Sequence, residues 1–161
     1  MQNNKYVKLH SLLRMFAALL GIAVFISMFT AKQVVHSDSE FNNVFADFSN
    51  GAFFGDTVYK NGNWIAFIGY LLVFIGGLVG LAFVFIDEII GKDLTKKLSF
   101  VVGGVMVLGA IAILLVAPIF IAMNDLPKDF TTAAGPIVFG ILALLAGAAN
   151  IAAPILEDKG H

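Results

Sequence analysis

Long apolar stretches separated by short charged segments make up most of this 161-residue chain. A helix rises about 1.5 Å per residue and the hydrocarbon core of a bilayer is roughly 30 Å thick, so about 20 apolar residues cross it. The stretches are continuous rather than alternating, which favours helices over a membrane β-barrel. The pattern predicts four membrane spans at about 11–31, 64–88, 97–123 and 130–156.

The predicted fold is all-α, a polytopic membrane protein with a four-transmembrane-helix bundle as one domain over residues 1–161. Composition supports this prediction, because 59% of the residues are hydrophobic and 13% are charged, against about 25% charged in soluble proteins. The net charge of −1 gives no basis for binding nucleic acid. Cysteine is absent, which excludes disulfides and thiolate chemistry.

The distribution of basic residues predicts the orientation in the membrane. Four spans place both termini on one side. That side holds seven of the ten basic residues and the opposite side holds three, at Lys32, Lys60 and Lys128. The positive-inside rule therefore predicts that the N-terminus and the C-terminus are cytoplasmic. We expect a bacterial plasma membrane, because the chain is compact and has no Asn-x-Ser/Thr glycosylation motif.

The span interiors are predicted to be free of ionisable groups. Arg14 is interpreted as lying at a span end and snorkelling to the surface, and His10, His36 and His161 as lying outside the spans. This prediction argues against a proton-coupled carrier, a voltage sensor and a buried haem. We therefore expect no catalytic, cofactor or metal site. An interfacial enzyme using Asp87, Glu88 or the acidic residues of the outer side is a weaker hypothesis, because a partner base for these carboxylates is missing, and Asp87 and Glu88 also suit the end of the second span.

Small residues recur within the spans. Gly76 and Gly80 form a Gly-x-x-x-Gly motif, and Ala133, Gly140 and Gly147 recur every seven residues in the fourth span. Small residues let helix backbones approach closely in lipid. We expect spans two and three to use them for internal packing, whereas part of the fourth span is a candidate surface for another subunit.

Several residues predict local geometry. Gly91 and Asp93 are expected to cap the helices on either side of the cytoplasmic turn between spans two and three. Pro118 is expected to kink the third span. Pro136 is expected to lie in the first turn of the fourth span, and Pro154 is expected to end that span. Asn150 is expected to form an interhelical hydrogen bond rather than to line a polar cavity.

The outer loop, residues 32–63, is predicted to be ordered. A capping-box sequence at 37–40 followed by apolar residues at helical spacing predicts a short amphipathic helix over about 38–49. The aromatic residues of the loop are either anchors for a partner or are buried under the loop itself. Trp64 also suits the aromatic belt at the membrane interface.

The leading functional hypothesis is a non-catalytic membrane subunit that packs with itself or with a partner membrane protein. An oligomeric channel or facilitator for a small solute or lipid is the alternative. The topology resembles that of tetraspan junction proteins, but the Gly-Leu-Trp and the two cysteines of their first outer loop are missing, so no family is implied. The candidate interaction residues are Phe41, Phe45, Phe48, Phe53, Phe54, Trp64, Gly140, Gly147 and Asn150.

Overall fold

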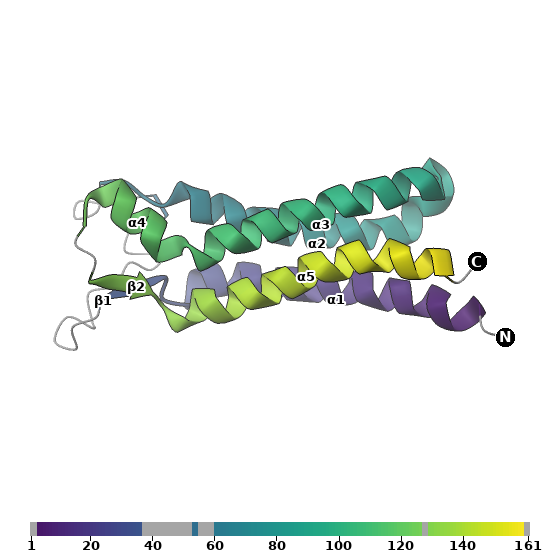
Figure 1. Ribbon diagram of the computed structural model, residues 1–161, viewed down its shortest axis with the longest axis horizontal. Helices are drawn as coiled ribbons and strands as arrows, with labels where there is room; N and C mark the ends of the chain where they lie inside the picture. Colours follow the sequence, from purple (N-terminus) through teal and green to yellow (C-terminus); the bar gives the residue numbers. More distant parts are fainter. Residues whose placement is uncertain (1–2, 37–52, 55–59, 127–128, 160–161) are drawn as a thin grey trace.

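Four long helices run side by side along the molecule (Figure 1). The computed structural model describes residues 3–36, 53–54, 60–126 and 129–159. Its elements are α1 (Asn3–Thr30), β1 (Val34–His36), α2 (Trp64–Ile90), α3 (Lys92–Leu114), α4 (Val116–Asn124), β2 (Phe130–Thr132) and α5 (Ala134–Lys159). Both termini and the α2–α3 turn lie at one end, called here the terminal end; β1, β2 and α4 lie at the other, the loop end.

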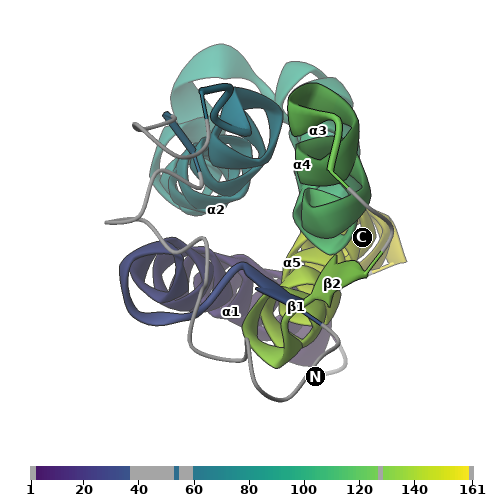
Figure 2. The ribbon, with the colours of Figure 1, turned by 90° about the vertical axis from the view of Figure 1, so that its left-hand side faces the viewer.

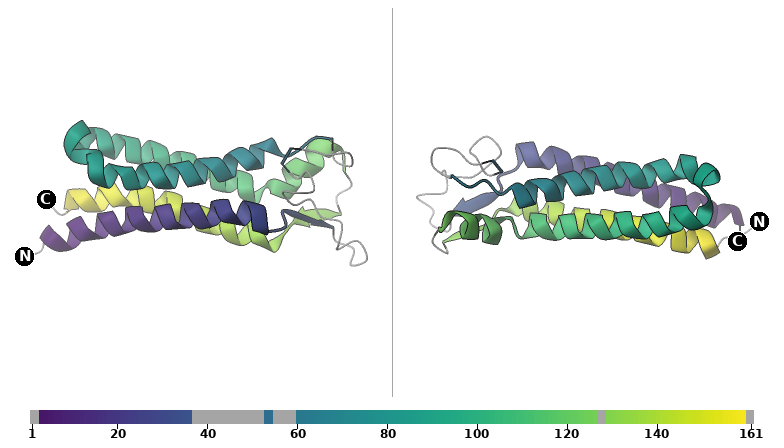
Figure 3. Two further views of the ribbon diagram at one scale, coloured as in Figure 1. Left: turned by 180° about the vertical axis from the view of Figure 1, so that it is seen from behind. Right: turned by 90° about the horizontal axis from the view of Figure 1, so that it is seen from above.

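The four long helices form a ring around one core. α1 packs beside α2 and α5, and α3 packs beside the same two helices; the end-on view in Figure 2 and the two side views in Figure 3 show this order. Each of the four has the length and apolarity needed to cross a membrane, with Leu9–Thr30 as that part of α1. The prediction of an all-helical chain with four helices long and apolar enough to span a membrane is therefore confirmed.

Helix periodicity sorts each span into an inner and an outer face. In α1, His10, Arg14, Ala17, Gly21 and Val24 recur at intervals of three or four residues and are all buried. Large apolar side chains between them, such as Leu12 and Leu19, are 58% and 63% exposed. An outer face of this kind suits lipid rather than water.

The third predicted span is two helices, because α3 ends at Leu114 and α4 begins at Val116. Pro118 causes the break, since proline has no N–H for the carbonyl group four residues earlier, here that of Leu114, and its ring crowds that group. Side chains at the loop end donate to carbonyl groups on both sides of the break. Thr132 Oγ1 donates to Leu114 O at 3.4 Å, and Asn63 Nδ2 donates to Val116 O at 2.8 Å.

The fourth span also differs from the prediction at both ends. Residues 130–132 are strand rather than helix, because β2 pairs antiparallel with β1 in the register Val34↔Thr132. Pro136 lies in the first turn of α5, as predicted. The prediction that Pro154 ends the helix is wrong, because α5 continues to Lys159; beyond Pro154 its Glu157 lies beside His10 of α1 and its Asp158 pairs with Lys96 of α3.

The turn between α2 and α3 is partly as predicted. Gly91 is the C-cap of α2, with φ of 89°, and its N–H donates to Asp87 O at 2.9 Å. A positive φ favours glycine. Gly91 is also the N-cap of α3, so the prediction of Asp93 as that cap is wrong; Asp93 lies in the first turn and pairs with Lys97 at 2.7 Å.

Candidate functional site

The main polar site of the described residues is built around Arg14, inside the bundle near its terminal end. The Arg14 side chain is 1% exposed and is the largest of the fully buried side chains. Its Nη1 donates to Ser99 Oγ of α3 at 2.8 Å and to Gly80 O of α2 at 3.3 Å. The guanidinium carbon lies 5.5 Å from the centre of the Phe83 ring. Arg14 thus joins α1 to both α2 and α3.

The prediction that Arg14 snorkels to the surface is wrong, because its side chain is buried inside the bundle. α1 begins at Asn3, so Arg14 lies more than two turns inside the helix, and Ser99 lies two turns inside α3. His10, predicted to lie outside the spans, falls within the apolar segment Leu9–Thr30 and is 7% exposed. A charged residue within a membrane span is costly and is by default a candidate functional residue.

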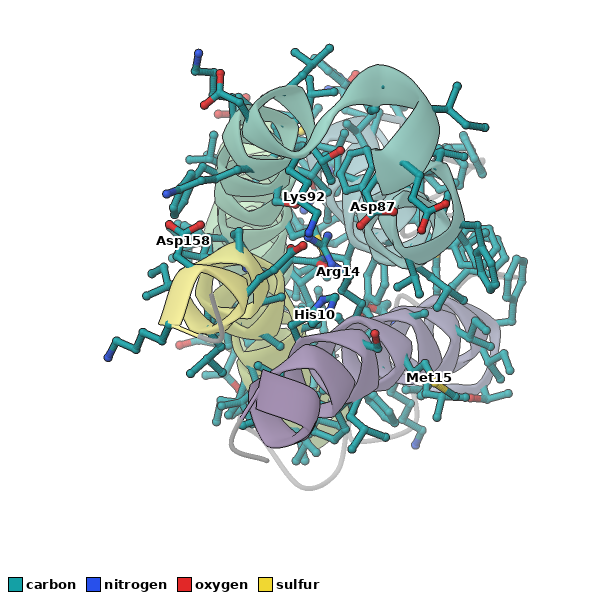
Figure 4. The ribbon with its side chains drawn as sticks, turned by 90° about the vertical axis from the view of Figure 1, so that its right-hand side faces the viewer. His10, Arg14, Met15, Asp87, Lys92 and Asp158 are labelled. Atoms are coloured by element: carbon teal, nitrogen blue, oxygen red, sulfur yellow. The ribbon has the colours of Figure 1, made fainter. Side chains whose placement is uncertain are left out.

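Further charged groups surround His10 at the terminal end (Figure 4). His10 Nδ1 lies 3.9 Å from Glu157 Oε2 of α5 and has no hydrogen-bond partner within the described chain. Asp87 of α2 and Lys92 of α3 also act electrostatically on His10, as does Arg14. All four spanning helices therefore contribute a charged or titratable side chain to this cluster, which we call the terminal cluster: His10, Arg14, Asp87, Lys92 and Glu157.

Asn150 lies next to this cluster and makes the predicted interhelical contact. It is fully buried, and its Nδ2 donates to Gly76 O of α2 at 3.4 Å and lies 3.0 Å from Met106 Sδ of α3. Its Oδ1 has no hydrogen-bond partner among the described residues and lies against Gly80, where a Cβ would collide with it. Gly80 therefore contacts Asn150 and accepts a hydrogen bond from Arg14, which continues the polar region toward the middle of the bundle.

The two candidate glycines of the fourth span pack within the chain. A Cβ at Gly140 would lie 2.6 Å from Leu114 Cδ2, and a Cβ at Gly147 would lie 2.9 Å from Val107 Cγ2 and 3.0 Å from Gly103 O. Both glycines are buried in the contact between α5 and α3. Close approach of these two helices depends on them.

The aromatic candidates of the outer loop divide into buried and exposed residues. Phe53 is fully buried, edge-on to Tyr70 with 5.8 Å between the ring centres. The next residue, Phe54, is 60% exposed and packs on Phe67 at 4.8 Å, and Trp64 is 54% exposed. The predicted amphipathic helix at 38–49, with Phe41, Phe45 and Phe48, lies outside the described residues.

Buried hydrogen bonds hold the loop end on the bundle. The Tyr70 hydroxyl donates to Gln33 Oε1 at 2.8 Å, and Gln33 Nε2 donates to Ala31 O at 2.9 Å. Both side chains are fully buried. Asn61 and Asn124 join the start of α2 to the end of α4, since Asn124 Nδ2 donates to Asn61 O at 2.7 Å. The sequence does not predict these contacts, because the residues are far apart along the chain.

Removing the Tyr70 hydroxyl tests how much this network stabilises the loop end. Tyr70→Phe leaves Gln33 Oε1 buried without its donor, which costs about 1–3 kcal/mol. We expect the free energy of unfolding in detergent to fall by this amount. Trp64→Phe, at an exposed position on the same helix, should change it by less than about 0.5 kcal/mol. Equal effects of the two variants would show that the Tyr70–Gln33 bond does not stabilise the fold.

Comparison with known proteins assigns this chain to no family. No family model, no curated protein and no solved structure matches it. The chemistry of the terminal cluster and of the loop end therefore rests on the contacts described above.

Proposed function

We propose that the chain is a non-catalytic integral membrane subunit that packs with itself or with a partner membrane protein. In this proposal it lies in a bacterial plasma membrane with both termini in the cytoplasm, and its loop end faces outward. The basic residues concentrated at the terminal end support that orientation.

Two exposed aromatic side chains at the loop end, Phe54 and Trp64, are the observation that carries this proposal, and we call them the aromatic pair. Phe54 points outward beside Phe53, whose ring is fully buried against Tyr70. A Cβ at Gly62 would collide with the backbone of these two phenylalanines, so the start of α2 lies directly against them. Rigid, exposed aromatic side chains lose little entropy on binding and are common anchors in protein interfaces.

The packed interior supports a packing role over conduction through one bundle. Val24, Val73, Met106 and Ala143 from the four spanning helices are all fully buried in one core cluster. Gly69 and Gly109 bring the backbones of α2 and α3 into contact. The alternative hypothesis, a channel or facilitator, would therefore place its path between copies of the chain. Proteoliposomes that show flux of a small solute would favour that alternative.

Cross-linking from single cysteines tests the proposal, because the chain has no natural cysteine. Phe54→Cys and Trp64→Cys should give cross-linked dimers or adducts with one partner in native membranes. Asp129→Cys, also exposed and at the loop end, is the matched control and should give about tenfold less product if the aromatic pair forms the interface. Equal yields at the three positions, together with a monomer that co-purifies with nothing in mild detergent, would reject the proposal.

A further inference from the structure

The terminal cluster combines one buried fixed charge with one buried titratable group. Arg14 is 1% exposed and His10 is 7% exposed, whereas Glu157 and Asp87 are half-buried and Lys92 is exposed. Among the fixed charges of the cluster, Arg14 and Lys92 are positive and Asp87 and Glu157 are negative. The cluster is therefore electrically balanced when His10 is neutral.

The Arg14 guanidinium contacts only neutral acceptors in the described chain. Its two hydrogen bonds both come from Nη1, to a hydroxyl and a carbonyl oxygen, and no carboxylate of the described residues lies within 4.0 Å of it. A buried charge is costly unless it is paired. The planar guanidinium has five N–H donors in an arrangement that matches an oxyanion.

His10 provides a second, independent observation. It lies one helical turn before Arg14 on the same face of α1, and its buried Nδ1 has no hydrogen-bond partner within the described chain. Glu157 Oε2 is 3.9 Å from this nitrogen, which is too far for a hydrogen bond. The carboxylate of Glu157 thus lies beside His10 Nδ1 without forming a hydrogen bond to it.

We propose that His10 and Arg14 form a binding site for a small oxyanion, a phosphate or carboxylate group, and that the Glu157 carboxylate competes for this site. Its donors are the Arg14 guanidinium, the His10 ring N–H and the Ser99 hydroxyl. Glu157 belongs to the last turns of α5, where its side chain is 14% exposed and has a short path to water. An anion that displaces Glu157 leaves the charge balance of the cluster unchanged.

A free anion and a lipid headgroup share this chemistry, so the experiment has two arms. The full chain is placed in nanodiscs of phosphatidylcholine and titrated with inorganic phosphate, or it is placed in nanodiscs containing phosphatidylglycerol without phosphate. The unfolding temperature is measured in both. A rise with phosphate identifies a free anion as the ligand, and a rise with phosphatidylglycerol identifies a lipid headgroup.

Three variants distinguish this site from a structural role of Arg14. Glu157→Gln removes the competing charge and should lower the half-saturating anion concentration about tenfold, which corresponds to about 1.4 kcal/mol. Arg14→Met keeps much of the side-chain volume and should abolish the response. Lys97→Gln, at an exposed position near the same end, is the matched control and should respond as the natural chain does.

If Arg14→Met does not fold, a direct measurement at His10 still tests the proposal. The Nδ1 resonance of His10, assigned by its loss in His10→Gln, should shift on addition of the anion. The proposal is overturned if neither arm raises the unfolding temperature of the natural chain or of Glu157→Gln, if folded Arg14→Met responds as the natural chain does, or if the His10 resonance is unmoved.

Discussion

A single methyl group added at Gly109 is expected to weaken the bundle strongly, whereas the same change at Gly104 is not. A Cβ at Gly109 would lie 2.7 Å from Gly69 O and 3.1 Å from Val73 Cγ2 of α2. Because the first of these atoms belongs to the backbone, the two helices must move apart. Overpacking of this kind costs about 1–3 kcal/mol.

Gly104 is the matched control for this prediction because it lies on the same helix. A Cβ there has nothing within 4 Å. Gly104→Ala should therefore leave stability unchanged or raise it by up to about 1 kcal/mol, since alanine is the better helix former. The free energies of unfolding of the two variants, measured in one detergent, should differ by at least about 1 kcal/mol.

The reverse contact strengthens the prediction. A Cβ at Gly69 would lie 2.7 Å from Gly109 O, so each glycine faces the backbone of the other. Lipid supplies no hydrophobic drive for helices to associate, and close backbone packing takes its place. If Gly109→Ala and Gly104→Ala prove equally stable, then α2 and α3 do not meet at this point.

The predicted spans agree with the structure where length and apolarity determine them. α2 begins at Trp64, and the ends of α1 and α5 that face the loop end lie within four residues of their predicted positions. Gly91 and Pro136 were assigned correctly because their effect on the backbone is local. These features depend on the chain near each residue and require no knowledge of how the helices pack.

Features that depend on contacts between distant residues were not predictable in this way. Residues 130–132 are one phenylalanine and two threonines, which suit a strand but also fit the start of an apolar span, and pairing with β1 decides between them. Pro118 indicated a kink, but the complete break also involves distant side chains. Thr132 donates to the Leu114 carbonyl group that Pro118 leaves without a helical donor, and Asn63 donates to Val116 O.

The burial of Arg14 could have been predicted from the spacing of residues in the first span, although average hydropathy does not reveal it. The buried residues of α1 continue from Val24 through Gly21 and Ala17 to Arg14 and His10 at intervals of three and four. The stripe of small residues in the first span therefore already placed Arg14 on the inner face. Treating the residue as a flank of the span, rather than as part of this stripe, led to the wrong prediction.

The size of the Arg14 side chain and its charge are expected to affect stability in opposite directions. Arg14→Ala leaves a cavity where the largest of the fully buried side chains had been, and large-to-small changes in a core cost about 2–5 kcal/mol. Arg14→Met fills much of this volume without a charge to desolvate. Replacing buried ionic groups by well-packed apolar residues is often neutral or stabilising by about 1–4 kcal/mol. Unfolding of both variants in one detergent measures the difference.

The outcome of this pair of substitutions decides why the chain keeps a charge inside its bundle. Ser99 loses its donor in both variants, but its hydroxyl can turn to a carbonyl group of its own helix. Lys96→Ala is the control, because Lys96 pairs with Asp158 at the surface and such pairs contribute about 0–1 kcal/mol. If Arg14→Met is as stable as the natural chain, stability does not require the charge, and a ligand becomes the better reason for it. If Arg14→Met is as damaging as Arg14→Ala, the charge itself holds α1 to α2 and α3.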